Sequence, residues 1–320
     1  APAPTSSAGS AGSAAPDPGE RGVRVLTTGL EAPWGLAFLP GGEALVTERD
    51  TARILRVPAG GGIPTEVQRL SEVDGGGEGG LLGIAVFLAA VLTGSTQLFA
   101  LARETGLWLF LVPTVFLVSH RMIPFFSQSA LMNYIMVRPA WGPSLMAVCV
   151  TAHAGFELSG LPQWRFLADL PLAIAALHHT WVWQFRRSFH ARLLAMLHIA
   201  FLWLGIGMSL YAAQSLVLLA TGSDYFGRAP LHALGIGFLA SMIVAMASRV
   251  TLGHSGRTLS ADTLTWAVLF GVNASAVLRI TGEFLPPLAH WINLLAALVW
   301  LAALSPWVLR YLPMYLQPRV

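Results

Sequence analysis

The sequence predicts a mainly α-helical, polytopic transmembrane bundle that follows a short antiparallel β segment. Hydrophobic residues make up 55% of the 320 residues, charged residues only 11%, and the mean hydropathy is +0.63. A water-soluble domain carries about a quarter charged residues. Residues 1–86 hold six Arg and ten acidic residues (−4), whereas residues 87–320 hold thirteen Arg and six acidic residues (+7). We therefore divide the chain near residue 86 and place the second part in a membrane.

The first part has two sections. Residues 1–20 are rich in Ala, Pro, Gly and Ser, which predicts a disordered linker, either behind an export signal or lipid anchor or inside a longer gene product. Residues 21–86 show short apolar runs between Gly-Gly and Pro-Gly turns, as in antiparallel strands. We expect at most four strands, within the ranges 23–30, 34–40, 43–50 and 51–62.

The second part contains stretches without any Asp, Glu or Arg. About 20 apolar residues at 1.5 Å per residue cross the roughly 30 Å hydrocarbon layer. Seven stretches predict transmembrane helices, and an eighth, 79–102, is a further candidate that begins in the glycine-rich β region. The seven are 105–120, 139–156, 170–185, 193–223, 229–248, 263–278 and 284–309.

The arginines between these stretches predict their orientation. Assigning the connections alternately to two sides puts nine arginines on one side and four on the other, and the positive-inside rule places the nine in the cytoplasm. If 79–102 spans the membrane, the β segment is cytoplasmic as well; otherwise it lies outside. The nine are Arg121, Arg138, Arg186, Arg187, Arg192, Arg249, Arg257, Arg310 and Arg319; the four are Arg103, Arg165, Arg228 and Arg279.

Two family resemblances divide at the same place. "LEAPWGLAFLPGGEALVTERDTARILRV", followed by "GGEGGLLGIAV", resembles the opening of the PQQ-dependent glucose and sorbosone dehydrogenases, which are six-bladed β-propellers. That resemblance covers residues 22–86 and would supply about one blade, whereas a propeller needs several. The family's catalytic His, Ca²⁺ ligands and most PQQ-binding residues fall beyond this segment, so an incomplete propeller fragment is expected.

"HALGIGFLASMIVAMASRVTLGHSGRTL" (232–259) and "SHRMIPFFSQ" (119–128) resemble the NnrS family of polytopic bacterial membrane proteins. That resemblance extends from about residue 87 to the C-terminus. It implies an inner-membrane protein with haem and copper that is linked to nitric oxide and denitrification. Family members have around twelve helices, so this chain would hold the C-terminal seven. Two alternatives stay open: a membrane-tethered PQQ-dependent sugar dehydrogenase, and a non-functional join of two genes.

Histidines inside the spans are the candidate metal ligands. Ionisable groups buried among membrane helices are costly and usually functional or paired, and imidazole suits haem iron and copper. Counting depth along each helix predicts an inner-leaflet group and an outer-leaflet group. The inner group is His178, His179 and His198; the outer group is His153, His232 and His290, with Glu157 one turn from His153.

Each of these sites has a structural alternative. His178 and His179 are adjacent and point about 100° apart, so at most one of them is an axial ligand, and we take His178. With His198 and His232, it is a candidate ligand of a haem b held without a covalent link, because the single cysteine, Cys149, excludes a CxxCH attachment. Met242 and Met246 either pack in the core or add soft copper ligands.

The polar loop 248–258 is a candidate anion site. Arg249, His254 and Arg257 could bind a haem propionate, for which the planar guanidinium is well suited; alternatively they are a positive-inside signal. Arg121 is a propionate partner or an interface anchor. The sequence holds no Walker A, Rossmann, HExxH or G-x-S-x-G motif. Its arginines are spread over one membrane face, which argues against nucleic-acid binding, and Gly235 and Gly237 indicate close helix packing.

Overall fold

The structure, a computed structural model, describes residues 25–69, apart from residues 32, 40, 49, 50 and 52, and residues 94–315. It divides into two compact units, Ala1–Ile84 and Ala85–Val320. The linker predicted for residues 1–20 and most of the candidate span 79–102 lie outside the described residues.

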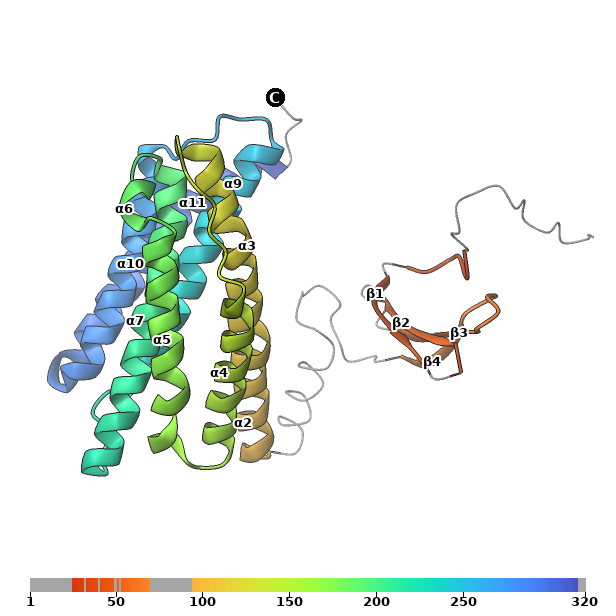
Figure 1. Cartoon of the computed structure of the whole chain (residues 1–320), viewed down its shortest axis with the longest axis horizontal. Coiled ribbons are helices and arrows are strands. Elements are labelled where there is room, and N and C mark those ends of the chain that lie inside the picture. The colour runs from red at the N-terminus through yellow and green to blue at the C-terminus, as the bar shows by residue number, and fades with distance from the viewer. Residues whose placement is uncertain are drawn as a thin grey trace, which may run out of the picture. The chain divides into compact units, whose positions relative to one another are not determined.

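The first unit contains a four-stranded antiparallel sheet in the order β1-β2-β3-β4 (Figure 1). Its hydrophobic cluster comes from Ala44, Val46 and Val57, with Leu26 and Leu30 packed against them. The strands are β1 (Pro33–Phe38), β2 (Ala44–Glu48), β3 (Arg53–Val57) and β4 (Thr65–Arg69).

Three of the four predicted strands are confirmed, and the strand predicted within 23–30 is wrong in its described part. Residues 25–30 have no regular structure. The side chains of Leu26 and Leu30 pack against the hydrophobic cluster of the sheet, but the segment adds no strand to it. The fourth strand is β4, whose five residues are all exposed. Apolar alternation therefore gave no signal for it, since neither face of that strand is buried.

A buried carboxylate closes one end of this sheet. Glu48 accepts hydrogen bonds from the Glu31 amide (2.8 Å), the Thr51 hydroxyl (2.5 Å) and Arg53 Nε (2.8 Å). Burial alone raises the pKa of Glu48, but these bonds outweigh it and hold the pKa below its ordinary value of 4.5. A carboxyl group whose pKa is lower in the folded state stabilises fully above its unfolded pKa, and that contribution disappears as the pH falls through the folded pKa.

We therefore expect the stability of the sheet to be constant between about pH 7 and pH 5 and to fall below about pH 4.5. Hydrogen exchange of the β2 and β3 amides, corrected for intrinsic rates, measures this. Glu48→Gln should weaken protection by about 1–3 kcal/mol at neutral pH and flatten the acid response. Glu66→Gln is the control, because the Glu66–Arg69 pair (3.3 Å) is exposed. An unchanged acid profile in Glu48→Gln would contradict the assignment.

The described part of the second unit, residues 94–315, contains seven long helical segments that run alternately in opposite directions (Figure 1). They confirm the predicted helical bundle. The segments are α2–η1–α3 (Thr96–Glu104, Thr105–Leu111, Val112–Ala130), α4 (Trp141–Leu158), α5 (Phe166–Val182), α7 (Arg192–Thr221), α8–η3–α9 (Ala229–His232, Ala233–Ala240, Ser241–His254), α10 (Thr263–Phe284) and α11 (Ala289–Tyr311).

Five of these segments are long and apolar enough to cross a bilayer, judged by length and composition. The two others, α4 and α5, have 18 and 17 residues. Short helices connect or end the segments: η2 (Pro162–Trp164), α6 (Phe185–Ser188), η4 (Pro286–Leu288) and η5 (Leu312–Tyr315). The chain is therefore a multi-pass membrane protein.

The first long segment differs from the predicted division. The charged pair Arg103-Glu104 was expected to separate the stretches 79–102 and 105–120, but one continuous helix runs from Thr96 to Ala130. Glu104 is buried and accepts a hydrogen bond from Arg103 Nε (2.7 Å). A paired charge can remain inside a helix, so the absence of charge marked the wrong boundary here.

Helix α7 is the centre of the bundle, and α11 lies at its edge. Of the most apolar stretch of α7, 67% is buried inside the bundle; of the corresponding stretch in the last segment, Pro286–Tyr315, which contains α11, only 11% is buried. Gly237 of η3 packs face-on against α7: a Cβ there would overlap the ring of Trp203. Trp203 in turn donates a hydrogen bond to Asn273 on α10. The predicted close packing holds at Gly237, whereas a Cβ added to Gly235 would meet open space, with no atom within 4 Å.

The arginines lie toward the two ends of the bundle as the alternating helices require. We call the two ends the Arg-rich end and the Arg-poor end; Arg319 lies outside the described residues. The Arg-rich end carries Arg121, Arg138, Arg186, Arg187, Arg192, Arg249, Arg257 and Arg310, and the Arg-poor end carries Arg103, Arg165, Arg228 and Arg279.

Candidate functional site

The predicted inner group of histidines is only partly assembled. His198 on α7 is buried, and its Nε2 lies 3.1 Å from the hydroxyl of Ser127 on α3. His179 is also buried, but its neighbour His178 is exposed, with the two rings at 88° to each other. His178 therefore points away from the core, and the adjacent His179 points into it.

The predicted outer group does not converge. His153 is buried in α4. The Nε2 of His232 lies 3.3 Å from Arg279 Nη2 and 3.3 Å from Glu283 Oε1, and His290 is exposed. Within the described ranges, no three His, Cys, Asp or Glu side chains gather in a way that could hold a metal ion. Met242 and Met246 pack in the main hydrophobic cluster.

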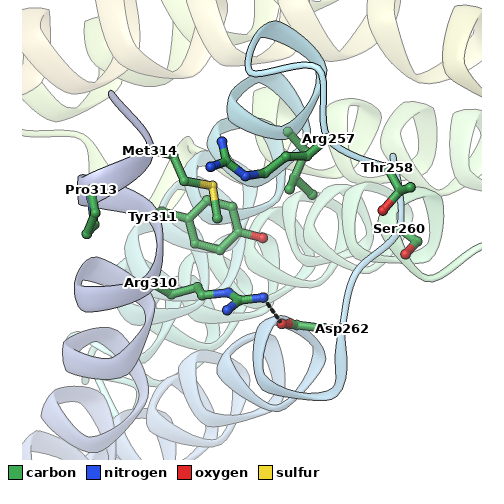
Figure 2. A pocket seen from close by; sticks show the side chains of 9 residues that line it. Arg257, Thr258, Ser260, Asp262, Arg310, Tyr311, Pro313 and Met314 are labelled. Atoms are coloured by element: carbon green, nitrogen blue, oxygen red, sulfur yellow. Dashed lines mark hydrogen bonds and ion pairs between the residues drawn. The ribbon is translucent and has the colours of Figure 1, made fainter. Parts of the chain in front are cut away.

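The basic residues of the loop 248–258 also separate. Arg249 lies over the ring of Phe126 (3.9 Å to its centroid), whereas His254 is exposed. Arg257 lines a different pocket of about 450 Å³, in which Tyr311 lies between Arg257 and Arg310 (Figure 2). Arg310 also pairs with Asp262 (3.2 Å).

Arg121 is exposed on α3, and its backbone carbonyl accepts a hydrogen bond from Arg138 Nη2 (3.2 Å). Arg121 does not line the pocket that contains Arg257 and Arg310. The four predicted anion-binding residues thus do not share one site.

A polar pocket of about 510 Å³ lies at the Arg-poor end. It is formed by α2, the π-helix η1, α4, α7 and the segment that follows α7. π-Helical turns inside α-helices are frequent at functional sites. Three acidic and three basic residues line the pocket together with two aromatic rings and a histidine. They are Glu104, Glu157, Asp224, Arg103, Arg165 and Arg228, with Trp108, Tyr211 and His153.

His153, which lines this pocket, is paired with the buried Asp169. His153 Nδ1 lies 2.5 Å from Asp169 Oδ1 of α5, and both side chains are at most 1% exposed. The ring of Trp108 lies against His153 with centroids 3.6 Å apart and the planes tilted by 33°, and Tyr211 meets the imidazole edge-on at 5.1 Å. Because Nδ1–H donates to the carboxylate, the lone pair of His153 is on Nε2.

Arg165 ties the helices around the pocket together. It pairs with Glu157 and donates hydrogen bonds to the Pro162 carbonyl (3.0 Å) and to Gln214 Oε1 (3.1 Å). The amide of Gln214 then donates to both carboxylate oxygens of Asp224 (3.0 Å each). These bonds link the ends of α4, α5 and α7; Arg165 and Gln214 are buried, whereas Glu157 is partly exposed and Asp224 is exposed.

These residues fit a haem or another metal centre with one histidine ligand. A metal-bound histidine almost always donates its other ring N–H to a carboxylate or carbonyl, as His153 does. A volume of about 510 Å³ is within the usual range of small-molecule sites. Arg228 has no side-chain hydrogen bond or ion pair to the described residues and could meet a carboxylate of the ligand.

Sequence reasoning named His153 and Glu157 but missed Asp169, Arg165 and Trp108. One signal was available: Glu157 and Asp169 flank the short connection between two antiparallel spans. Because the two helices run in opposite directions, Asp169 lies at about the same depth as His153, which is sixteen residues earlier in the sequence. Trp108 gave no signal, because its position depends on the π-helical turn.

Comparison with protein families agrees with the division of the chain. The model described as NnrS protein matches residues 79–319, and the model described as Glucose / Sorbosone dehydrogenase matches residues 30–89. Both resemblances seen in the sequence are confirmed. No curated protein and no solved structure matches the chain.

Proposed function

Because the chain belongs to the NnrS family, we propose that its helical unit is a multi-pass protein of a bacterial inner membrane that binds haem b and responds to nitric oxide. The observation that carries the proposal is the His153–Asp169 bond of 2.5 Å beside the Arg-poor pocket. Haem iron in this place would supply an open coordination position for nitric oxide or a nitrosylated species.

The residues of the pocket have distinct roles in this proposal. His153 would hold the iron of a bound haem, and Asp169, through its hydrogen bond to Nδ1, would fix the ring and raise its basicity. Trp108 and Tyr211 hold the histidine from its two sides and exclude water. Arg228 pairs with a propionate, while Arg165 keeps the pocket walls together.

The positive-inside rule gives the pocket its orientation. The Arg-rich end lies in the cytoplasm, so the pocket opens toward the opposite, periplasmic side. Nitric oxide is small and uncharged and reaches such a site from either the membrane or the aqueous phase. His198 and the pocket of Arg257 and Arg310 lie toward the cytoplasmic end, which is the alternative placement of the haem, with a propionate near these arginines.

The second candidate function is that of a membrane-tethered PQQ-dependent sugar dehydrogenase. Only the family match at residues 30–89 favours it. The first unit shows four strands, about one propeller blade, whereas a propeller typically has four to eight blades. The remaining interpretation is a join of two genes without a common function.

One set of measurements separates these functions. The chain is purified in detergent, and its absorption spectrum and metal content are recorded with and without nitric oxide. We expect a Soret band that shifts when nitric oxide is added. Sugar-dependent dye reduction with added PQQ and Ca²⁺ would instead support the dehydrogenase, and the absence of both signals would leave the join of two genes.

A further inference from the structure

A basic pocket lies between the ends of α3, α7 and α9 at the Arg-rich end of the bundle. Its volume is about 610 Å³, within the usual range of small-molecule sites. Arg192, the first residue of α7, and Arg249 of α9 line it together with His190. None of the described residues that line it is acidic. The two arginines therefore give the pocket a net positive charge, which favours an anion.

Arg249 is a cation inside a membrane span without a counter-ion in the described part of the chain. It belongs to the apolar segment Ala229–His254 and lies five residues before its end, about 7 Å at 1.5 Å per residue. The half-buried guanidinium lies 3.9 Å from the centroid of the Phe126 ring, which stabilises its charge. It makes no hydrogen bond or ion pair with the described residues. Because charged side chains in membrane spans are costly and usually paired, an anion from outside the chain is the expected partner.

The carboxylate next to this pocket serves a different arginine. Asp262 follows Ala261, which lines the pocket, but Asp262 lines the neighbouring pocket and pairs with Arg310 (3.2 Å). Arg192, like Arg249, has no ion pair with the described residues. The described part of the chain therefore leaves the positive charge of this pocket uncompensated.

Apolar side chains line the pocket beside the cations. Leu193 is buried, whereas Leu259 is 54% exposed. A ligand with a charged head and an apolar body would suit this lining. Its head could bind the guanidinium groups through charge-assisted hydrogen bonds, while its body covers Leu259.

We propose that this pocket binds the phosphodiester group of an anionic membrane phospholipid. The planar fork of Arg suits phosphate oxygens, and basic pockets between membrane helices on the cytoplasmic side bind anionic headgroups. A zwitterionic lipid would place its ammonium group beside two arginines, with no described carboxylate in the lining to receive it. The pocket therefore selects a headgroup that carries no cation.

This inference does not depend on the proposed haem. The described lining of this pocket shares no residue with that of the Arg-poor pocket. The two pockets also lie at opposite ends of the bundle. A chain without haem can thus bind the lipid, and a chain with haem can fail to bind it.

The test is native mass spectrometry of the full chain, released from detergent after titration with phosphatidylglycerol or phosphatidylcholine. We expect one phosphatidylglycerol to bind at least about 10-fold more tightly than phosphatidylcholine. Arg249→Gln and Arg192→Gln should each weaken phosphatidylglycerol binding by about 10–100-fold, because each removes hydrogen bonds between charged groups. Arg186→Gln is the matched control, since Arg186 is exposed at the same end and does not line the pocket. It should change the affinity by about 3-fold or less.

A second pair of variants tests the pocket without changing any charge. Ser129 is an exposed residue of the lining, and Gln128 is an exposed neighbour outside it. Ser129→Trp should fill the pocket and weaken phosphatidylglycerol binding although both arginines remain, whereas Gln128→Trp should leave binding unchanged. Arg192 is also exposed, so Arg192→Gln and Ser129→Trp keep the test decisive if Arg249→Gln fails to fold.

Equal affinities of the wild-type chain for the two lipids would overturn the proposal, as would equal effects of Arg192→Gln and Arg186→Gln. Displacement of phosphatidylglycerol by millimolar inorganic phosphate would identify a soluble anion as the occupant and would also overturn it. The Soret band provides the remaining distinction. If Arg249→Gln removed the Soret band but left phosphatidylglycerol binding unchanged, the occupant would be a haem propionate and the lipid site would be refuted.

Discussion

Replacing His153 with Ala is expected to abolish the Soret band of the purified chain. The reason is that His153 is the buried histidine whose Nδ1 is held by a carboxylate, Asp169 at 2.5 Å, and which lines a pocket of about 510 Å³. Alanine at this position would remove the nitrogen that holds the iron, whereas Asp169→Asn would keep that nitrogen and lose the orientation and basicity that the carboxylate gives it. We expect Asp169→Asn to weaken haem binding by about 10–100-fold.

The measurement is the haem-to-protein ratio from absorption and from iron analysis. His190→Gln serves as the control, since His190 is exposed and its Nδ1 lies 3.0 Å from the backbone carbonyl of Arg187. His198→Gln discriminates between the two placements of the haem. A Soret band that survives His153→Ala and disappears in His198→Gln would move the ligand to the Arg-rich half of the bundle.

The bundle was predictable from the sequence because burial in lipid imposes a simple requirement. Every backbone polar group must be paired inside its own helix and charges must be sparse, so stretches without charge located the helices. The requirement fails where a charge is paired locally. Arg103 and Glu104 bond to each other, and the helix from Thr96 to Ala130 continues through them.

The candidate sites were less predictable because depth along a helix does not specify direction. His178 and His179 lie at nearly the same depth, yet one is exposed and the other buried. One residue corresponds to a turn of about 100°, and which of the two faces the core depends on how α5 packs against α4 and α7. Residue counting could not resolve that choice.

The basic loop shows the same limit. Arg249 and Arg257 are eight residues apart in the sequence, but Arg249 lies over the ring of Phe126, whereas Arg257 lines a pocket together with Arg310 of α11. Partners from distant helices decide which pocket each arginine lines. Such partners follow from the tertiary arrangement and leave no local pattern.

The second large effect is expected at Arg165, where Arg165→Met should destabilise the helical unit by about 3 kcal/mol. The Arg165 side chain is 7% exposed, and its guanidinium pairs with Glu157 and donates hydrogen bonds to Gln214 and the Pro162 carbonyl. Removing it leaves Glu157 without its partner and Gln214 with an unmatched oxygen, and leaving a buried charge uncompensated costs more than the pair gains. Glu157 is 23% exposed, so water offsets part of this cost and the low end of the usual range applies.

The free energy of unfolding is measured by titrating the purified chain from a mild detergent into dodecyl sulfate and following tryptophan fluorescence. Arg310→Met is the matched control: Arg310 and Asp262 are 54% and 42% exposed, and such surface pairs contribute about 0–1 kcal/mol. The double variant Arg165→Met with Glu157→Leu should recover part of the loss, because no charge then remains without a partner. Equal effects of Arg165→Met and Arg310→Met would mean that the network around the Arg-poor pocket is fully hydrated and does not hold the ends of α4, α5 and α7 together.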